Sequence, residues 1–205
     1  MTLRSALLHP LAKPLVFVLC LLPLAWLVWG AATDQLGANP AEALIRGLGD
    51  WTLRFLCLAL AVTPLRLHTR TPQLARYRRM LGLFVFFYAC LHLLAYGWLD
   101  MGLQVADIGR DILKRPFILV GFACWLLLLP LALTSTNRAV RALGGRAWQT
   151  LHRLVYLVAG LALLHFFWMR SGKNDYAEVA LYAAIIGVLL LERLFRYLKP
   201  RGVAS

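Results

Sequence analysis

The sequence predicts an all-α membrane protein, a six-transmembrane-helix bundle with both termini in the cytoplasm. Three observations lead to this fold: the apolar content, the length of the apolar runs and the distribution of charge. Of the 205 residues, 61% are hydrophobic, and the mean hydropathy is +0.70, whereas soluble domains are about 45–50% apolar. We expect one domain over residues 1–205, with no room for a large water-soluble catalytic domain.

The apolar runs define the expected helices, because a span must cross about 30 Å of hydrocarbon. Six runs are long enough: 15–31, 51–65, 80–98, 117–134, 150–169 and 177–198. The second is the weakest, since Arg54 interrupts it. The first follows basic residues, as a signal peptide would, but it is long for one and lacks a convincing cleavage site. We therefore expect it to remain as a helix.

The charges orient the bundle. Alternate loops hold eight of the nine acidic residues, whereas fourteen basic residues gather at the other helix ends. Basic residues mark the cytoplasmic side of a membrane. This set comprises Arg4, Lys13, Arg66, Arg70, Arg76, Arg78, Arg79, Arg138, Arg141, Arg146, Arg193, Arg196, Lys199 and Arg201. The net charge of +13 therefore reflects topology in membrane lipid. Nucleic-acid binding is excluded, because membrane spans separate these short basic loops.

Three histidines, His92, His152 and His165, lie inside apolar runs. Lipid offers no water, so each imidazole needs a hydrogen-bond partner, a proton-relay role or a metal. The helices that carry His92 and His165 run in the same direction, which places both residues at similar depth in the periplasmic half. Two neutral imidazoles satisfy the axial positions of a haem iron. A zinc site would need more donors than this depth provides.

His152 lies roughly 20 Å from His165 along the same helix, near the cytoplasmic end, where a second haem could bind. The two rings share a face only if the helix bends or tilts, or if their rotamers compensate. The spacing between His152 and His165 is thirteen residues. Thirteen residues before His92, just ahead of the helix over 80–98, stands Arg79, with Arg78 beside it. Their guanidinium groups suit haem propionates. The sixth ligand is then unassigned, and His68 is one candidate, although a solvated loop histidine is the favoured interpretation.

Each residue also has a structural interpretation. An intramembrane histidine can bond a carbonyl of a neighbouring helix, and His152 can reach interfacial water beside Gln149 and Arg153. Arg54 can pair with Asp50 one turn earlier, the favoured interpretation, or reach a propionate of the outer haem.

Several short segments resemble a known family. The sequence is similar to the haem-binding membrane subunits of periplasmic protein-methionine-sulfoxide reductase systems, the MsrQ/YedZ family of ferric-reductase-like transmembrane proteins. That wider group typically places paired histidines on two helices, and His92, His152 and His165 fill three of the four positions. Arg78 or Arg79 occupies the fourth. The segments are Asn39-Pro40-Ala41-Glu42, Gly47-Leu48-Gly49-Asp50-Trp51, Thr63-Pro64-Leu65-Arg66, Tyr77-Arg78-Arg79-Met80-Leu81-Gly82, Leu91-His92 and Leu151-His152-Arg153-Leu154.

The resemblance implies an electron carrier of the bacterial inner membrane. Such a protein takes electrons from quinones through one or two b-type haems to a periplasmic molybdopterin-containing methionine-sulfoxide reductase. It thereby supports repair of oxidised proteins. Flavin mononucleotide (FMN) is implied by the resemblance alone, because the sequence has no dinucleotide fingerprint. Bis-imidazole ligation leaves no open iron position, so catalysis belongs to the partner. The acidic segment with Asp100, Asp107 and Asp111 is the expected docking surface.

Two alternatives remain open at this point. One is a transmembrane ferric or other metal reductase fed by a soluble flavin reductase. The other is a small proton-coupled transporter in which the histidines relay protons. The transporter is disfavoured, since Glu192 is the one carboxylate near a helix interior.

Overall fold

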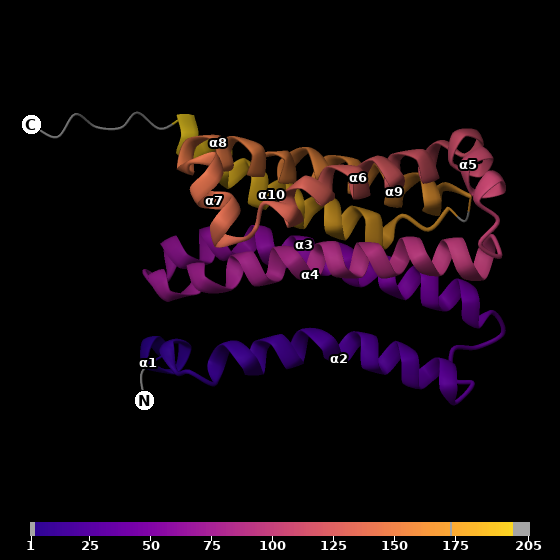
Figure 1. Ribbon diagram of the computed structural model, residues 1–205, viewed down its shortest axis with the longest axis horizontal. Coiled ribbons are helices and arrows are strands. Elements are labelled where there is room, and N and C mark those ends of the chain that lie inside the picture. Colours follow the sequence, from indigo (N-terminus) through magenta and orange to yellow (C-terminus); the bar gives the residue numbers. More distant parts are fainter. Residues whose placement is uncertain (1–2, 173, 199–205) are drawn as a thin grey trace, which may run out of the picture.

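The structure, a computed structural model, describes residues 3–172 and 174–198, with side chains from residue 6 onward. Within these ranges the chain is helical and has no strand, which confirms the all-α prediction. The long helices run side by side along the longest axis (Figure 1). The helices are α1 (Leu3–Leu8), α2 (Ala12–Ala32), α3 (Pro40–His68), α4 (Ala75–Ala95), α5 (Val105–Lys114), α6 (Pro116–Leu133), α7 (Asn137–Leu143), α8 (Gly145–His152), α9 (Leu154–Ser171) and α10 (Ala177–Leu198), with short turns η1 (Pro72–Leu74) and η2 (Tyr96–Asp100).

Among the described residues, five segments are long and apolar enough to cross a membrane. They correspond to the first five predicted spans: Ala12–Ala32, Pro40–His68, Pro72–Asp100, Pro116–Leu133 and Gly145–Ser171. The sixth predicted segment forms α10 with the expected bounds, but it is not one of the five. A sixth crossing therefore stays a prediction.

The apolar runs placed the start of the second long helix too late and missed one short helix. The second long helix begins at Pro40 and not at residue 51, because the Asn39 side chain accepts a hydrogen bond from the Glu42 N–H and Pro40 takes the first helical position. Both are helix-start signals. The segment between the predicted spans 80–98 and 117–134 contains α5. This helix is amphipathic, so a search for apolar runs misses it.

The predicted helix over 150–169 is divided in two. α8 ends at His152, and α9 begins at Leu154. At the junction the Arg153 N–H donates to the Thr150 carbonyl, three residues earlier, which is the tighter 3₁₀ pattern. A turn therefore separates the two histidines that were expected on one continuous helix.

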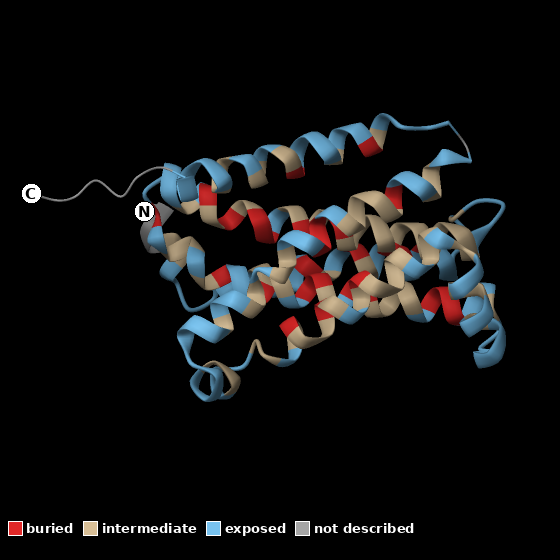
Figure 2. Cartoon of the chain, turned by 90° about the horizontal axis from the view of Figure 1, so that it is seen from above, coloured by how far each residue is buried: buried red, intermediate tan, exposed pale blue. Residues whose placement is uncertain are grey.

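The core lies where α3 packs along α4 and α6 packs along α9. Figure 2 shows buried residues toward the middle of the bundle and exposed residues on its outside. Many of the exposed side chains are large and apolar, including Trp26 and Phe195, as expected of a surface that contacts lipid. The largest fully buried side chains are Tyr88, Leu56, Leu60, Ile186, Val85 and Val158.

Tyr88 fixes α2 to the bundle at a proline. Pro23 lies inside α2, where it has no N–H to donate to the preceding turn. The next N–H, of Leu24, donates to the Tyr88 hydroxyl at 3.1 Å. That hydroxyl donates to the Cys20 carbonyl at 2.8 Å. The tyrosine is thus inserted into the backbone hydrogen bonds of α2, a known cause of helix bending.

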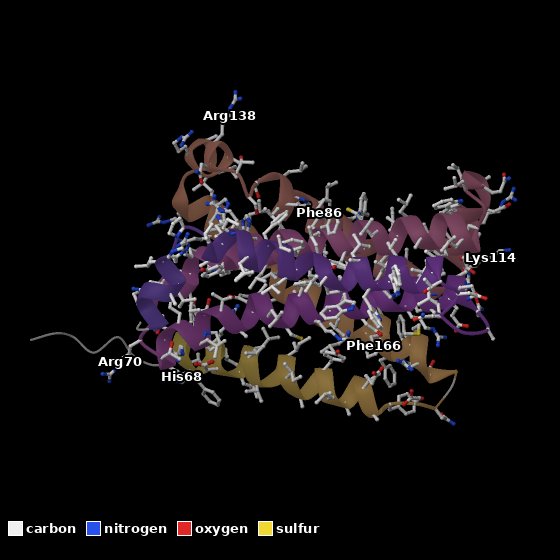
Figure 3. The ribbon with its side chains drawn as sticks, turned by 90° about the horizontal axis from the view of Figure 1, so that it is seen from below. His68, Arg70, Phe86, Lys114, Arg138 and Phe166 are labelled. Carbon is white, nitrogen blue, oxygen red and sulfur yellow. The ribbon has the colours of Figure 1, made fainter. Side chains whose placement is uncertain are left out.

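Two of the basic residues predicted to face the cytoplasm, Arg70 and Arg138, lie at the same end of the bundle (Figure 3). α1, α7, α8 and the end of α10 lie at one end, and α5 lies at the other (Figure 1). His68, Arg70 and Arg138 occupy the first end, and Lys114 the second (Figure 3). Of the predicted cytoplasmic residues, Lys199 and Arg201 lie outside the described residues, as does the side chain of Arg4.

Candidate functional site

His92 and His165 lie together. His92 is on α4 and His165 on α9, and their ring centroids are 6.2 Å apart at an interplanar angle of 77°. With metal–nitrogen bonds of about 2 Å and each ring centroid about 1 Å behind its nitrogen, two axial imidazoles place their centroids about 6 Å apart. The separation of the two rings is therefore compatible with a metal ion between them.

Hydrogen bonds set the orientation of both rings. Nδ1 of His92 lies 2.8 Å from the Ile45 carbonyl oxygen, and Nδ1 of His165 lies 2.6 Å from that of Phe117. A carbonyl only accepts, so each Nδ1 carries the proton and each Nε2 keeps its lone pair. Metal-bound histidines are oriented in this way. The carbonyl contact considered as a structural alternative is thus present, and it leaves Nε2 available to a metal.

Two glycines make room for these imidazoles. A Cβ at Gly121, on α6, would lie 2.8 Å from Cε1 and Nδ1 of His165. A Cβ at Gly49, on α3, would lie 3.1 Å from Cε1 of His92. Neither glycine was predicted from the sequence to line the site. The available signal was a glycine inside a helix, which often marks close packing.

Near the opposite end, His152 also has a ring nitrogen suited to a ligand. Nδ1 of His152 donates to the Trp148 carbonyl at 3.0 Å, and its ring stacks on the Trp148 ring with centroids 3.9 Å apart. Nε2 is buried without a hydrogen-bond partner. An unpaired buried polar atom is costly. The geometry thus fits a metal or a donor from a ligand at this nitrogen.

His152 lines a cavity of about 590 Å³, here called the inner cavity. This volume is within the size range of cofactor pockets. Arg78 and Arg79 reach it from α4, and Arg193 reaches it from α10. α6 contributes Leu128, Leu131 and Ala132 to its wall, and Ser135 lies just after this helix. Because His165 contacts α6 at Phe117 and Gly121, both histidines of the divided segment face the same helix.

The remaining candidate residues are engaged elsewhere. Arg54 Nε donates to the Tyr182 hydroxyl at 3.1 Å, and its guanidinium lies over the Trp51 ring. The favoured ion pair of Arg54 with Asp50 is not formed between these two described residues. Tyr182 takes its place as the nearer partner.

Two further candidates for the cavity that His152 lines, Arg79 and His68, have partners of their own. Arg79 donates to Asn137 Oδ1 at 2.5 Å. His68 ends α3 and pairs with Glu192 at 2.7 Å, with 67% of its side chain exposed. It is not part of the cavity lining, which agrees with the solvated interpretation.

A cluster of polar side chains connects α5 to the segment that orients His165. The Tyr96 hydroxyl donates to Asp111 at 2.6 Å, as does Arg115 Nε. The hydrogen bond from Arg115 holds the pKa of Asp111 below its usual range. Arg115 also lies over the ring of Phe117, whose carbonyl orients His165. From the sequence, Asp111 was predicted only to be part of a docking surface.

The comparisons with known proteins identify a family of transmembrane proteins. A family model described as "Ferric reductase like transmembrane component" matches residues 47–163, so the chain is a ferric-reductase-like transmembrane protein. A Polaromonas naphthalenivorans protein is 66% identical over 93% of this chain and 87% of its own length. A Herminiimonas arsenicoxydans protein is 52% identical over 90% and 85%. Both are named "Protein-methionine-sulfoxide reductase heme-binding subunit MsrQ", and the chain belongs to this MsrQ family. No solved structure matches it.

Proposed function

We propose that this chain is a membrane cytochrome b in which His92 and His165 would hold an outer haem through their Nε2 atoms. The carrying observation is the 6.2 Å separation of the two rings, together with carbonyl contacts that leave both Nε2 atoms available. The relatives' names, which state heme binding, support the same proposal. When bound, haem b supplies a one-electron redox centre.

The chain's own residues favour electron transfer over bond chemistry. A haem held by both histidines would have no free coordination position for oxygen or a substrate. Ile45 and Phe117 hold the rings through their backbone carbonyls. The protein that receives the electrons must therefore supply the catalytic step. We infer that His152 provides a ligand for a second, inner haem, with Arg78 or Arg79 beside its propionates.

The same proposal extends to the partners. We propose that electrons come from quinones of the bacterial inner membrane and pass to a periplasmic molybdopterin-containing methionine-sulfoxide reductase. The relatives' names describe subunits of a methionine-sulfoxide reductase, which supports such a partner. The outer segment with Asp100, Asp107 and Asp111 is its proposed docking surface. A role for FMN rests on the family resemblance alone.

The test compares haem content in purified variants. His92→Ala and His165→Ala should each lose most of the outer haem, seen as loss of the reducible Soret and α-bands. His68→Ala is the control, because His68 is exposed and distant in sequence from both. Full haem content in both ligand variants would contradict the assignment. Vesicles supplied with quinol, and separately with a soluble flavin reductase, identify the electron donor by the rate of haem reduction.

A metal reductase is the second candidate, favoured by the description of the matching family model. It differs from the first proposal in its electron acceptor. Reduced vesicles mixed with a ferric chelate would reoxidise the haem rapidly if this function holds. The methionine-sulfoxide proposal instead expects slow reoxidation until the reductase partner is added.

A further inference from the structure

The inner cavity is strongly basic. Its lining includes the four guanidinium groups of Arg78, Arg79, Arg153 and Arg193, and no Asp or Glu side chain among the residues described. The charge of Arg193 repels that of Arg78. Positive groups gathered at a partly desolvated site need anions nearby, because an uncompensated charge there is costly. The cavity therefore suits a ligand that carries acidic groups.

Arg193 is held at this cavity by neutral groups. Its Nη2 donates to the Leu60 carbonyl on α3 at 2.5 Å, and its guanidinium lies 5.1 Å from the centre of the Tyr156 ring. Nε is buried without an acceptor. The residue is half-buried, so its charge is only partly hydrated. These contacts fix the side chain in position and leave its charge without a carboxylate partner.

Arg196, one turn further along α10, shows the ordinary alternative. It pairs with Glu192 at 2.5 Å on the exposed surface. Two arginines of one helix thus have opposite environments, an ion pair for Arg196 and a basic cavity for Arg193. Only the second environment lacks an anion.

We propose that Arg193, together with Arg78, binds a carboxylate of the ligand that His152 holds in the inner cavity. This inference rests on the proposed function, in which that ligand is haem and the carboxylates are its propionates. Guanidinium groups bind carboxylates through charge-assisted hydrogen bonds. Arg193 is then a positioning residue that connects α10 to the cofactor, a role that the outer site does not require of this helix.

The experiment measures haem stoichiometry, haem dissociation and midpoint potentials in purified protein. His152→Ala should lose one of two haems. Arg193→Gln should release that same haem about tenfold faster, as expected for loss of a charge-assisted hydrogen bond. Its midpoint potential should fall, because a nearby positive charge favours the reduced form. Arg196→Gln should match the wild type in all three measurements.

The inference is overturned if Arg193→Gln and Arg196→Gln behave alike, or if the wild type and His152→Ala hold the same number of haems. Retention of the outer haem reports correct folding in each variant. Should Arg193→Gln fail to accumulate, Arg193→Lys decides: a shifted midpoint supports the inference, and wild-type behaviour overturns it. A wild type without any haem would instead refute the proposed function itself.

Discussion

At the scale of single residues, the outer histidine pair depends on the absence of two side chains. Gly121→Ala would put a methyl group 2.8 Å from the His165 ring. Helix backbone carries this Cβ and cannot easily move, so the imidazole must shift. Overpacking of this kind costs about 1–3 kcal/mol. We expect the outer haem to be retained about tenfold less well, measured as haem per protein after extended washing.

The chain offers a matched control on α9. A Cβ at Gly160 meets no atom within 4 Å, so Gly160→Ala should keep its haem and gain slightly in helix stability. Gly49→Ala should give a milder defect than Gly121→Ala, since its nearest contact is 3.1 Å. Equal haem retention in Gly121→Ala and Gly160→Ala would show that close approach to His165 is unimportant.

At the scale of helices, the attachment of α2 depends on one hydroxyl. Tyr88→Phe removes the group that joins the Leu24 N–H to the Cys20 carbonyl. Lost pairing of buried backbone groups costs about 1–3 kcal/mol, less if α2 relaxes. We expect Tm in detergent to fall by several degrees. Tyr176→Phe, at an exposed position, should melt like the wild type, and the same melting in both variants would refute the role of Tyr88.

The short helix α5 should have acid-sensitive stability. Because hydrogen bonding from Arg115 lowers the folded pKa of Asp111, the stabilisation is fully present above the ordinary aspartate pKa of about 3.9. It is lost as the pH falls through the lower, folded value. Asp111→Asn should therefore lower Tm by about 2 °C at neutral pH. This difference should disappear in strong acid.

Asp107→Asn provides the comparison, because Asp107 forms an exposed pair with Arg110. It should change Tm little at any pH. A difference between wild type and Asp111→Asn that persists unchanged below the folded pKa would exclude the ionised carboxylate as its cause.

At the scale of the whole molecule, long apolar runs were sufficient to predict the main helices. The bounds of α10 agree with the predicted 177–198. The similar depth of His92 and His165, predicted from the two parallel spans, is consistent with their being neighbours in the structure. Short features, and contacts between residues far apart in the chain, could not be predicted from the sequence. The turn at Arg153 interrupts a continuous apolar pattern at a single residue, so the pattern does not reveal it. The carbonyl of Ile45 could not be predicted either, because every residue has a backbone carbonyl and no side-chain type marks this one.

The last whole-molecule prediction concerns topology. Basic residues at one end of the bundle favour a cytoplasmic location for that end. Single cysteines introduced as Lys114→Cys and Asp175→Cys should react with a membrane-impermeant maleimide from outside intact spheroplasts. Arg138→Cys and Arg196→Cys should react only in inverted vesicles. The native cysteines lie in the helices and are buried or partly buried, and a cysteine-free background removes their contribution. Labelling of the residue 175 and 196 variants from the same side would mean that α10 does not cross the membrane. That result would contradict the predicted six-span arrangement.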